Sequence, residues 1–203
     1  MNQAHHVGNV SNVSNAGCDS EQSMSRDVGY FTLTGDVNSD MVRRVFEAIS
    51  KMTVDGTRTA HILLQSNGGY VSDGICLYNV MTHAPVDFVM YNGGAVASIA
   101  VTLYLAGRLR VASDTARFMI HKSHATAPVG ARPEALQIIA EGLMADDRRT
   151  EAILRRHVTL DETMWGVHAY SDLHLSASDA VGTGLIHRIG HFAPPTGNLV
   201  FNI

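Results

Sequence analysis

Three polar side chains stand where a hydroxyl, an imidazole and a carboxylate could meet. Ser98 lies in a Gly- and Ala-rich run that follows an apolar segment, His121 ends the apolar segment RFMI, and Asp172 precedes a short apolar segment late in the chain. Catalytic groups of open α/β sheets gather at the carboxyl ends of the strands. This set therefore predicts nucleophilic catalysis, in which the imidazole takes the hydroxyl proton near neutral pH and the carboxylate orients the imidazole.

Each of these residues alone also has a structural interpretation. A lone serine at a helix start is more often a cap or a small packing residue, and a histidine that ends an apolar strand is more often a core residue. The glycines before Ser98 favour a nucleophile, because they allow another backbone to approach it closely. Asp172 is favoured over Asp179 as the acid, because Asp179 follows Ser176 at the spacing of a capping box and so has a structural role.

Two glycines could complete the same site. Gly68 and Gly69 form a turn in the sequence SNGG after an apolar segment. An amide of this turn and the amide of Ile99 could together bind a developing oxyanion, and the missing side chains leave room for an extended peptide to pair with the backbone. A tight turn is the structural alternative. SNGG matches neither a P-loop nor GxGxxG, so phosphate binding is not predicted.

The sequence predicts no metal centre and no cofactor. His124 follows His121 at HxxH spacing, but KSHATAP offers neither a third ligand nor an acid, so we interpret His124 as a loop histidine. Cys18 and Cys76 make neither a disulfide framework nor a metal-ligand pattern, which favours a reducing, cytoplasmic compartment.

Strands that alternate with helices position these residues. The predicted strands are rich in β-branched and aromatic residues and cover residues 30–34, 61–65, 86–91, 108–112 and 117–120. The predicted helices start near Asn38 or Ser39 and near residues 72, 97, 132, 161 and 176. The GGA sequence at residues 93–95 is expected to form a turn. This alternation predicts an α/β fold of parallel βαβ units with right-handed crossovers.

We place one domain at residues 28–191, between two ends of different composition. Residues 1–27 are rich in Asn, Ser, Gly and His without a regular period, and are expected to form a flexible polar tail. Residues 192–203 are expected to form an extension whose order the sequence does not predict. The long helix at residues 132–158 is interrupted by DDRR at 146–149, and its residues favour an amphipathic surface helix over an oligomer interface.

Charge and hydropathy exclude several partners. The formal net charge is −4 and no basic cluster is present, so neither nucleic acid nor an anionic membrane is an expected partner. The longest run of low polarity, residues 95–107, is too short to cross a bilayer, and the N-terminus lacks the pattern of a secretory signal. A soluble globular protein is expected.

Four motifs in a fixed order resemble one peptidase family. SNGG, GGAVASIA with an Ala-Gly pair ending nine residues after the serine, RFMIH, and SDLHLSASDAVGTGLI resemble the ClpP family, the proteolytic subunit of Clp protease, over about residues 30–189. The resemblance implies a crotonase-like α/β fold, with residues 132–158 as a protruding handle helix, and serine endopeptidase activity. It implies Ser98 as nucleophile, His121 as base, Asp172 as orienting acid, Gly69 and Ile99 as oxyanion donors, and Gly68 in the substrate groove.

The resemblance also implies an assembly. The handle helix would join stacked heptamers of identical chains that enclose the active sites, with peptides or unfolded proteins as substrate. Residues 1–27 lack the apolar N-terminal helix by which the family engages its ATPase, so the sequence leaves a Clp ATPase partner open. Asn67 and Ile99 stand where the family usually has Pro and Met.

Three other functions stay open at this point. A Ser-Lys dyad is disfavoured, because Lys122 directly follows His121 and should point away, while Lys51 lies in an early helix. A crotonase-type acyl-CoA enzyme would share the fold and the oxyanion hole but would leave the Ser-His-Asp set unexplained. A scaffold subunit of a mixed Clp ring would carry the same residues without catalytic alignment.

Overall fold

The computed structural model describes Met1 and residues 27–203, so most of the predicted N-terminal tail, with Cys18, lies outside the described residues. The strands are β1 (Val28–Thr34), β2 (Thr59–Ser66), β3 (Asp87–Ala97), β4 (Leu109–Ala112), β5 (Arg117–Ile120), β6 (Leu173–Ser176), β7 (Arg188–Ile189) and β8 (Val200–Asn202). The helices are α1 (Ser39–Asp55), α2 (Val71–His83), α3 (Ile99–Tyr104), α4 (Pro133–His157), α5 (Glu162–Tyr170) and α6 (Ala177–Gly182).

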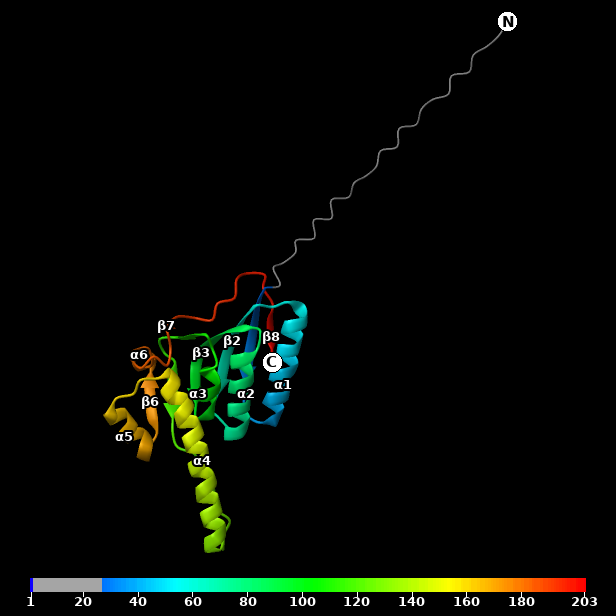
Figure 1. Cartoon of the computed structure of the whole chain (residues 1–203). Coiled ribbons are helices and arrows are strands. Elements are labelled where there is room, and N and C mark those ends of the chain that lie inside the picture. The colour runs from blue at the N-terminus through cyan, green and yellow to red at the C-terminus, as the bar shows by residue number, and fades with distance from the viewer. Residues whose placement is uncertain (2–26) are drawn as a thin grey trace.

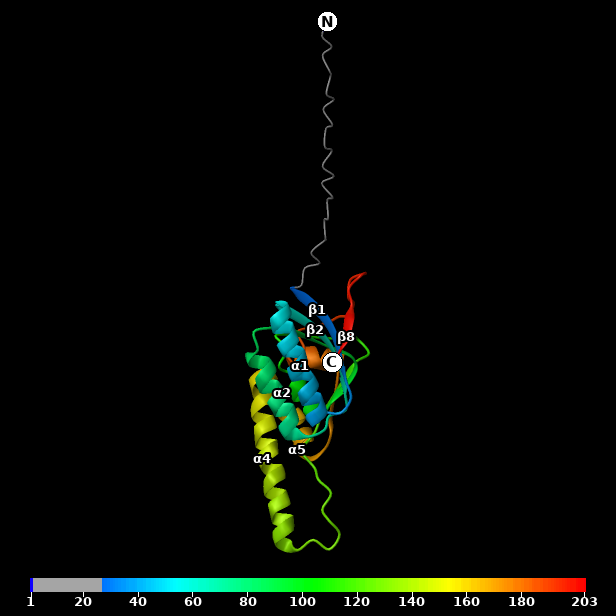
Figure 2. The same cartoon turned by 90° about the vertical axis from the view of Figure 1, so that its right-hand side faces the viewer.

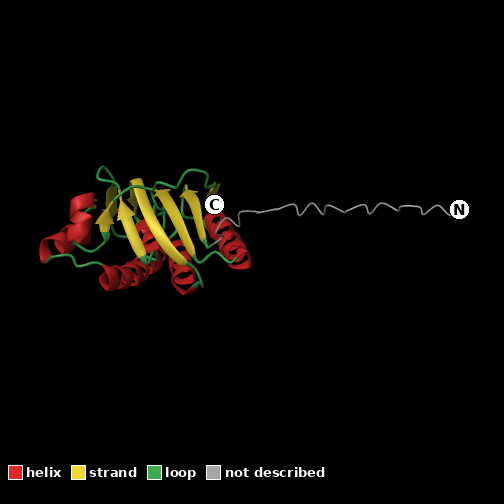
Figure 3. Ribbon diagram, turned by 90° about the horizontal axis from the view of Figure 1, so that it is seen from above, coloured by secondary structure: helices red, strands yellow, loops and turns green. Residues whose placement is uncertain are grey.

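Within the described residues the strands form one eight-stranded sheet. Its main order is β6-β5-β3-β2-β1-β8, and β4 pairs with β3 and with β7. The pairs are parallel except for β5 with β6, which run antiparallel. Figure 3 shows helices along one face of this sheet and at one of its ends. The α/β fold with parallel βαβ units is therefore confirmed.

The GGA sequence at residues 93–95 does not form the expected turn, because β3 continues through it to Ala97. Side chains satisfy the backbone of this stretch: Gly94 N–H donates to Asn92 Oδ1 at 2.9 Å, and Ala95 N–H donates to Gln65 Oε1 at 3.1 Å. The first half of β3 pairs with β4, and residues 95–97 pair with β5. The strand must stay extended to reach β5, and it therefore delivers Ser98 directly from the sheet.

The helix termini follow the expected signals. Asn38 caps α1 by accepting a hydrogen bond from Met41 N–H at 3.0 Å. Ser176 and Asp179 form the predicted capping box at the start of α6. The third helix begins at Ile99 rather than near residue 97, because β3 extends further than expected.

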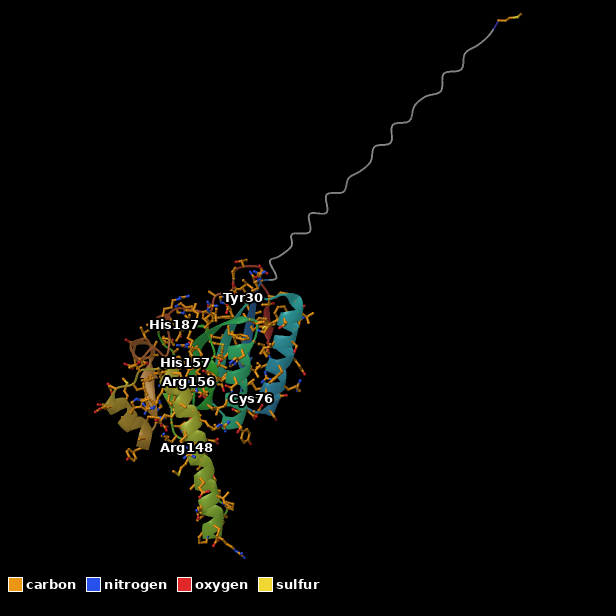
Figure 4. All side chains as sticks on the ribbon, in the orientation of Figure 1. Tyr30, Cys76, Arg148, Arg156, His157 and His187 are labelled. Carbon is orange, nitrogen blue, oxygen red and sulfur yellow. The ribbon has the colours of Figure 1, made fainter. Side chains whose placement is uncertain are left out.

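Helix α4 projects from the body of the molecule (Figure 1). In Figure 2 it lies beside α2 and then extends past the sheet. Figure 4 shows Arg156 and His157 at the end of α4 that lies against the body, with Arg148 further along the helix. That end is anchored where Nε2 of His157 lies 2.8 Å from the Tyr78 hydroxyl of α2, and Ile153 and Leu154 are the buried residues of α4. The first turns of the helix, which include Leu136 and Ile138, are exposed.

The C-terminal segment, whose order the sequence left open, contributes a strand to the sheet. Strand β8 pairs with β1 and extends the sheet beyond residue 191. The last residue, Ile203, is buried, its N–H donates to Thr32 O at 2.8 Å, and its carbonyl accepts from Arg44 of α1. These contacts include residues of α1 and β1 far away in sequence, so local pattern could not reveal them. No described helix is long and apolar enough to span a membrane.

Candidate active site

Ser98 occupies a strained turn between β3 and α3. Ser98 has a φ of 55° and a ψ of −134°. Among the described residues, no other non-glycine residue has a positive φ. Such a conformation costs about 1–3 kcal/mol and persists only where the surrounding structure fixes it. Here Ser98 N–H donates to Met119 O of β5 at 2.8 Å, and Ser98 O accepts from Val101 N–H at 3.0 Å. A sharp strand-to-helix turn of this kind presents a side-chain hydroxyl at the sheet edge.

Gly68 lies directly against this turn. A Cβ on Gly68 would stand 2.6 Å from Ser98 Cβ and 3.1 Å from Ser98 Oγ, and its φ is +107°. Both the space and the backbone conformation therefore require glycine. Within the SNGG turn, Ser66 Oγ accepts a hydrogen bond from Gly68 N–H at 3.2 Å and holds the turn in place. The close backbone approach expected from the glycines is thus made by the SNGG turn itself.

His121 follows the last residue of β5 and faces the serine. A hydrogen bond of 2.8 Å joins Nε2 of His121 to Ser98 Oγ. Burial lowers the pKa of His121 below its usual value, the nearby His124 lowers it further, and Asp172 and Asp147 act in the opposite direction. The imidazole is therefore neutral at pH 7 and can accept a proton from Ser98.

Asp172 faces the other nitrogen of the same ring. The antiparallel register pairs Ile120 with Leu173. His121, which follows Ile120, and Asp172, which precedes Leu173, therefore meet at the sheet edge. Asp172 Oδ1 lies 3.6 Å from Nδ1 of His121, longer than a hydrogen bond, and the Asp172 side chain is 53% exposed. The contact between Asp172 and His121 is thus looser than the one between Ser98 and His121.

The amides of Gly69 and Ile99 border this arrangement. Gly69 forms an isolated parallel bridge with Val37, in which Val37 N–H donates to Gly68 O and Tyr70 N–H donates to Val37 O, both at 2.8 Å. In a parallel bridge of this register the N–H of Gly69 itself points away from Val37. Ile99 is the first residue of α3, where an N–H has no acceptor within the helix. Two amides are therefore available near Ser98 for an anionic oxygen.

A cleft of about 670 Å³ opens over these groups and is walled by α3 and α4. Its polar lining includes Asp36, Asn38, Ser123, His124 and Asp146. The apolar lining consists of Val37, Val71, Ile99, Val101, Ile120, Leu143 and Leu154. Within residues 27–203 no group of three or more His, Cys, Asp or Glu side chains is placed to hold a metal ion. The apolar part of the lining can contact apolar groups of a ligand.

The two lysines are held elsewhere. Lys122 Nζ lies 2.9 Å from Glu151 Oε2 of α4, and Lys51 Nζ lies 3.1 Å from Asp55 Oδ2 within α1. Neither ammonium group faces Ser98, which removes the geometric basis for a Ser-Lys dyad.

Sequence reasoning missed the contribution of α4 to the site. The DDRR run reads as a solvated turn of the helix, yet Asp147 Oδ1 accepts from Ser123 N–H at 2.7 Å and fixes the segment after His121. Glu151 of α4 also holds this segment, through its ion pair with Lys122. Only the fold brings α4 alongside the segment that follows β5, and the acidic residues at helical spacing were the one available signal.

Comparison with known proteins identifies a family and several relatives. A family model described as Clp protease matches residues 17–192. The ATP-dependent Clp protease proteolytic subunit 2 of Corynebacterium glutamicum is 28% identical over 137 residues, which are 66% of this chain and 67% of that protein. The ATP-dependent Clp protease proteolytic subunit of Streptococcus pyogenes is 26% identical over 162 residues, which are 77% of this chain and 82% of that protein.

A solved structure shows the same fold. A mutant of ClpP1 from Listeria monocytogenes superposes with a TM-score of 0.70 at 18% identity, over 82% of this chain and 92% of that one. At this identity the likeness concerns the arrangement of helices and strands.

Proposed function

Because this chain belongs to the Clp protease family, we propose that it is a serine endopeptidase that hydrolyses peptide bonds through an acyl-enzyme. Ser98 is the proposed nucleophile, His121 the general base and Asp172 the orienting acid. One observation carries the proposal: the strained turn at Ser98 holds its hydroxyl 2.8 Å from Nε2 of a histidine that is neutral at pH 7.

The reaction follows from these positions. With its proton on Nδ1, toward Asp172, His121 accepts the Ser98 proton on Nε2 while Oγ attacks the peptide carbonyl carbon. The amides of Gly69 and Ile99 bind the oxyanion, and one such donor contributes about 3–4 kcal/mol to acyl transfer. The imidazolium then protonates the leaving amine. In the second half His121 deprotonates water, which releases the acyl group from Ser98.

The substrate would lie along the glycine turn. Gly68 and Gly69 present backbone without side chains beside Ser98, so an extended peptide can pair with this edge. We assign Gly68 to the substrate groove for this reason. No step in the scheme needs a cofactor.

Covalent labelling tests the assignment. A fluorophosphonate should label the full chain once, at Ser98, and Ser98→Ala should abolish labelling. Ser123→Ala is the matched control, because Ser123 lines the same cleft and should leave labelling intact. Labelling of the Ser98→Ala chain at the rate of the unmodified chain would refute the assignment.

We further propose that the chain assembles into stacked rings through α4. This helix projects from the body and exposes apolar side chains, with Leu136 44%, Ile138 70% and Met144 57% exposed. Exposed apolar residues on one element favour an interface. Native mass spectrometry should give a multiple of the chain mass that falls to a smaller multiple in Ile138→Asp. An unchanged assembly would exclude α4 from the interface. A Clp ATPase is a proposed partner by family membership.

The 3.6 Å separation of Asp172 from His121 favours a second candidate, a scaffold subunit of a mixed ring. A scaffold would assemble and yet resist the fluorophosphonate. Native mass and labelling measured on one sample therefore distinguish the two functions.

A further inference from the structure

His168 is a buried imidazole that the proposed mechanism does not use. It lies on α5, is 3% exposed, and its Nδ1 atom is buried without a hydrogen-bond partner. Among the described residues, Ser113 Oγ is the other buried side-chain atom in this condition. Buried polar atoms are nearly always paired, so an unpaired ring nitrogen close to a catalytic site requires an explanation.

A continuous series of contacts joins His168 to the end of β5. Its ring meets Trp165 edge to face, with centroids 5.6 Å apart, and the Arg155 guanidinium lies 3.9 Å from the centre of the Trp165 ring. Arg155 pairs with Glu151 at 2.7 Å, and Glu151 pairs with Lys122 at 2.9 Å. Lys122 directly follows His121. Helices α4 and α5 are thereby attached to the strand that carries the proposed base.

His168 is also connected to Asp172 and to His121, the two residues that lie 3.6 Å apart. Helix α5 leads through Ser171 into Asp172, and the N–H of Ser171 donates to Val167 O at 2.8 Å. The carbonyl of Ile120, the residue before His121, interacts with the His168 ring. His168 therefore lies near the end of β5 and on the helix that leads to Asp172.

We propose that His168 is a positioning residue which, in its neutral form, holds α5 against the end of β5 and so sets the distance between Asp172 and His121. The inference rests on the proposed function, because it concerns the alignment of the same site. A proton on Nδ1 would place a charged N–H group in a buried position without an acceptor. Helix α5 must then shift to admit water or a carboxylate, and Asp172 shifts with it.

Burial is the main reason that the pKa of His168 is lowered. Burial lowers its pKa, and the Lys122 ammonium adds to this effect, while Glu151, the Ile120 carbonyl and Asp147 oppose it. Arg155 faces the cluster from the far side of Trp165. Protonation therefore occurs only in acid, where His121 also titrates, and acid should disable the site by two separate protonations.

The single tryptophan of the chain allows a direct test, because Trp165 contacts His168. Protonated histidine quenches an adjacent indole. In Ser98→Ala, which cannot digest itself, fluorescence should fall reversibly as the pH drops from 8 to 5. Adding His168→Phe should abolish this fall, and adding His174→Phe, at an exposed position of β6, should retain it. A flat signal in Ser98→Ala, or a fall that survives His168→Phe, would overturn the inference.

The rate of fluorophosphonate labelling at Ser98 supplies the functional half of the test. Below its pKa, protonation of His121 alone reduces the rate by about 10-fold per pH unit, and displacement of Asp172 by protonated His168 adds a further fall no larger than loss of the Asp172 charge would cause. The unmodified chain should show the steeper slope and His168→Phe the shallower one. Equal slopes would overturn the inference even if Ser98 is labelled.

The two proposals fail in different ways. A chain that is never labelled at Ser98 contradicts the proposed function, and the fluorescence titration can still be measured. If His168→Phe does not fold, His168→Gln removes the same titration with a polar side chain and should give the same shallow slope. A steep slope in a folded His168→Gln chain would also overturn the inference.

Discussion

Replacing Gly68 by alanine should disable the site through its contact with Ser98. The new Cβ would stand 2.6 Å from Ser98 Cβ, about 0.8 Å short of the 3.4 Å at which ordinary contact begins. One of the two segments must move by roughly this amount. A misplacement of about 1 Å in an active site costs about 100-fold in rate. We expect Gly68→Ala to lower the rate of fluorophosphonate labelling at Ser98 by about 100-fold.

The backbone conformation contributes a separate loss of stability, which a matched variant measures. Gly35 has a φ of +103°, close to the +107° of Gly68, and a Cβ on Gly35 would meet nothing within 4 Å. Both alanine variants should lose about 1–2 kcal/mol of unfolding free energy from the left-handed backbone. Gly68→Ala should lose about 1–3 kcal/mol more from the forced contact.

Urea unfolding and labelling of the two variants separate these effects. Gly35→Ala should be destabilised and yet labelled at close to the unmodified rate. If folded Gly68→Ala is labelled within about threefold of Gly35→Ala, the SNGG turn does not position the nucleophile, and the argument from close approach is wrong.

Three further predictions concern the base, the acid and the C-terminal strand. Since burial lowers the pKa of His121, labelling should be constant from pH 8 to 7 and fall through a midpoint below the usual 6.5; a midpoint above 6.5 in a pH–rate profile would contradict this. Asp172→Asn should lower peptide turnover by about 10- to 100-fold, less than the about 10⁴-fold for a buried triad aspartate. Asp179→Asn is the control for Asp172→Asn. It should lower the unfolding free energy by about 1 kcal/mol, because Asp179 belongs to the capping box of α6, and it should retain activity. If Asp179→Asn loses activity and Asp172→Asn does not, Asp179 is the acid. Ile203→Ala should lower the unfolding free energy by about 2 kcal/mol with labelling retained, as measured in urea, and unchanged stability would show that β8 contributes little to the sheet.

The sequence predicts the parts of the site that depend on local pattern. Ser98 and His121 each follow a strand that is recognisable from its own residues, and parallel strands bring their carboxyl ends to one edge. Asp179 is excluded as the acid by a capping box that involves only residues 176–179. In each case the deciding interactions lie within a few residues of chain.

Long-range pairing explains what the sequence did not predict. Gly93 and Gly94 have the local preferences of a turn, but the Gln65 side chain and the β5 strand keep this stretch extended. The antiparallel pairing of β5 with β6 joins two four-residue segments over 50 residues apart, and no local feature specifies its register. Tertiary contacts override short-range propensity at such positions.

The proposed site therefore consists of two parts held by different interactions. The Ser98–His121 pair is fixed by the pairing of β3 with β5 and by the SNGG turn, in which Ser66 and Gly68 are buried. Asp172 depends on the short β5–β6 ladder and on α5, and its carboxylate is half exposed. Elements with few buried contacts open more readily than core strands. Acid or a substitution that loosens α5 would thus move Asp172 first and leave serine and histidine in contact. Attack on a reactive phosphonate should survive such a change better than peptide turnover, which needs the imidazolium stabilised in both halves of the reaction.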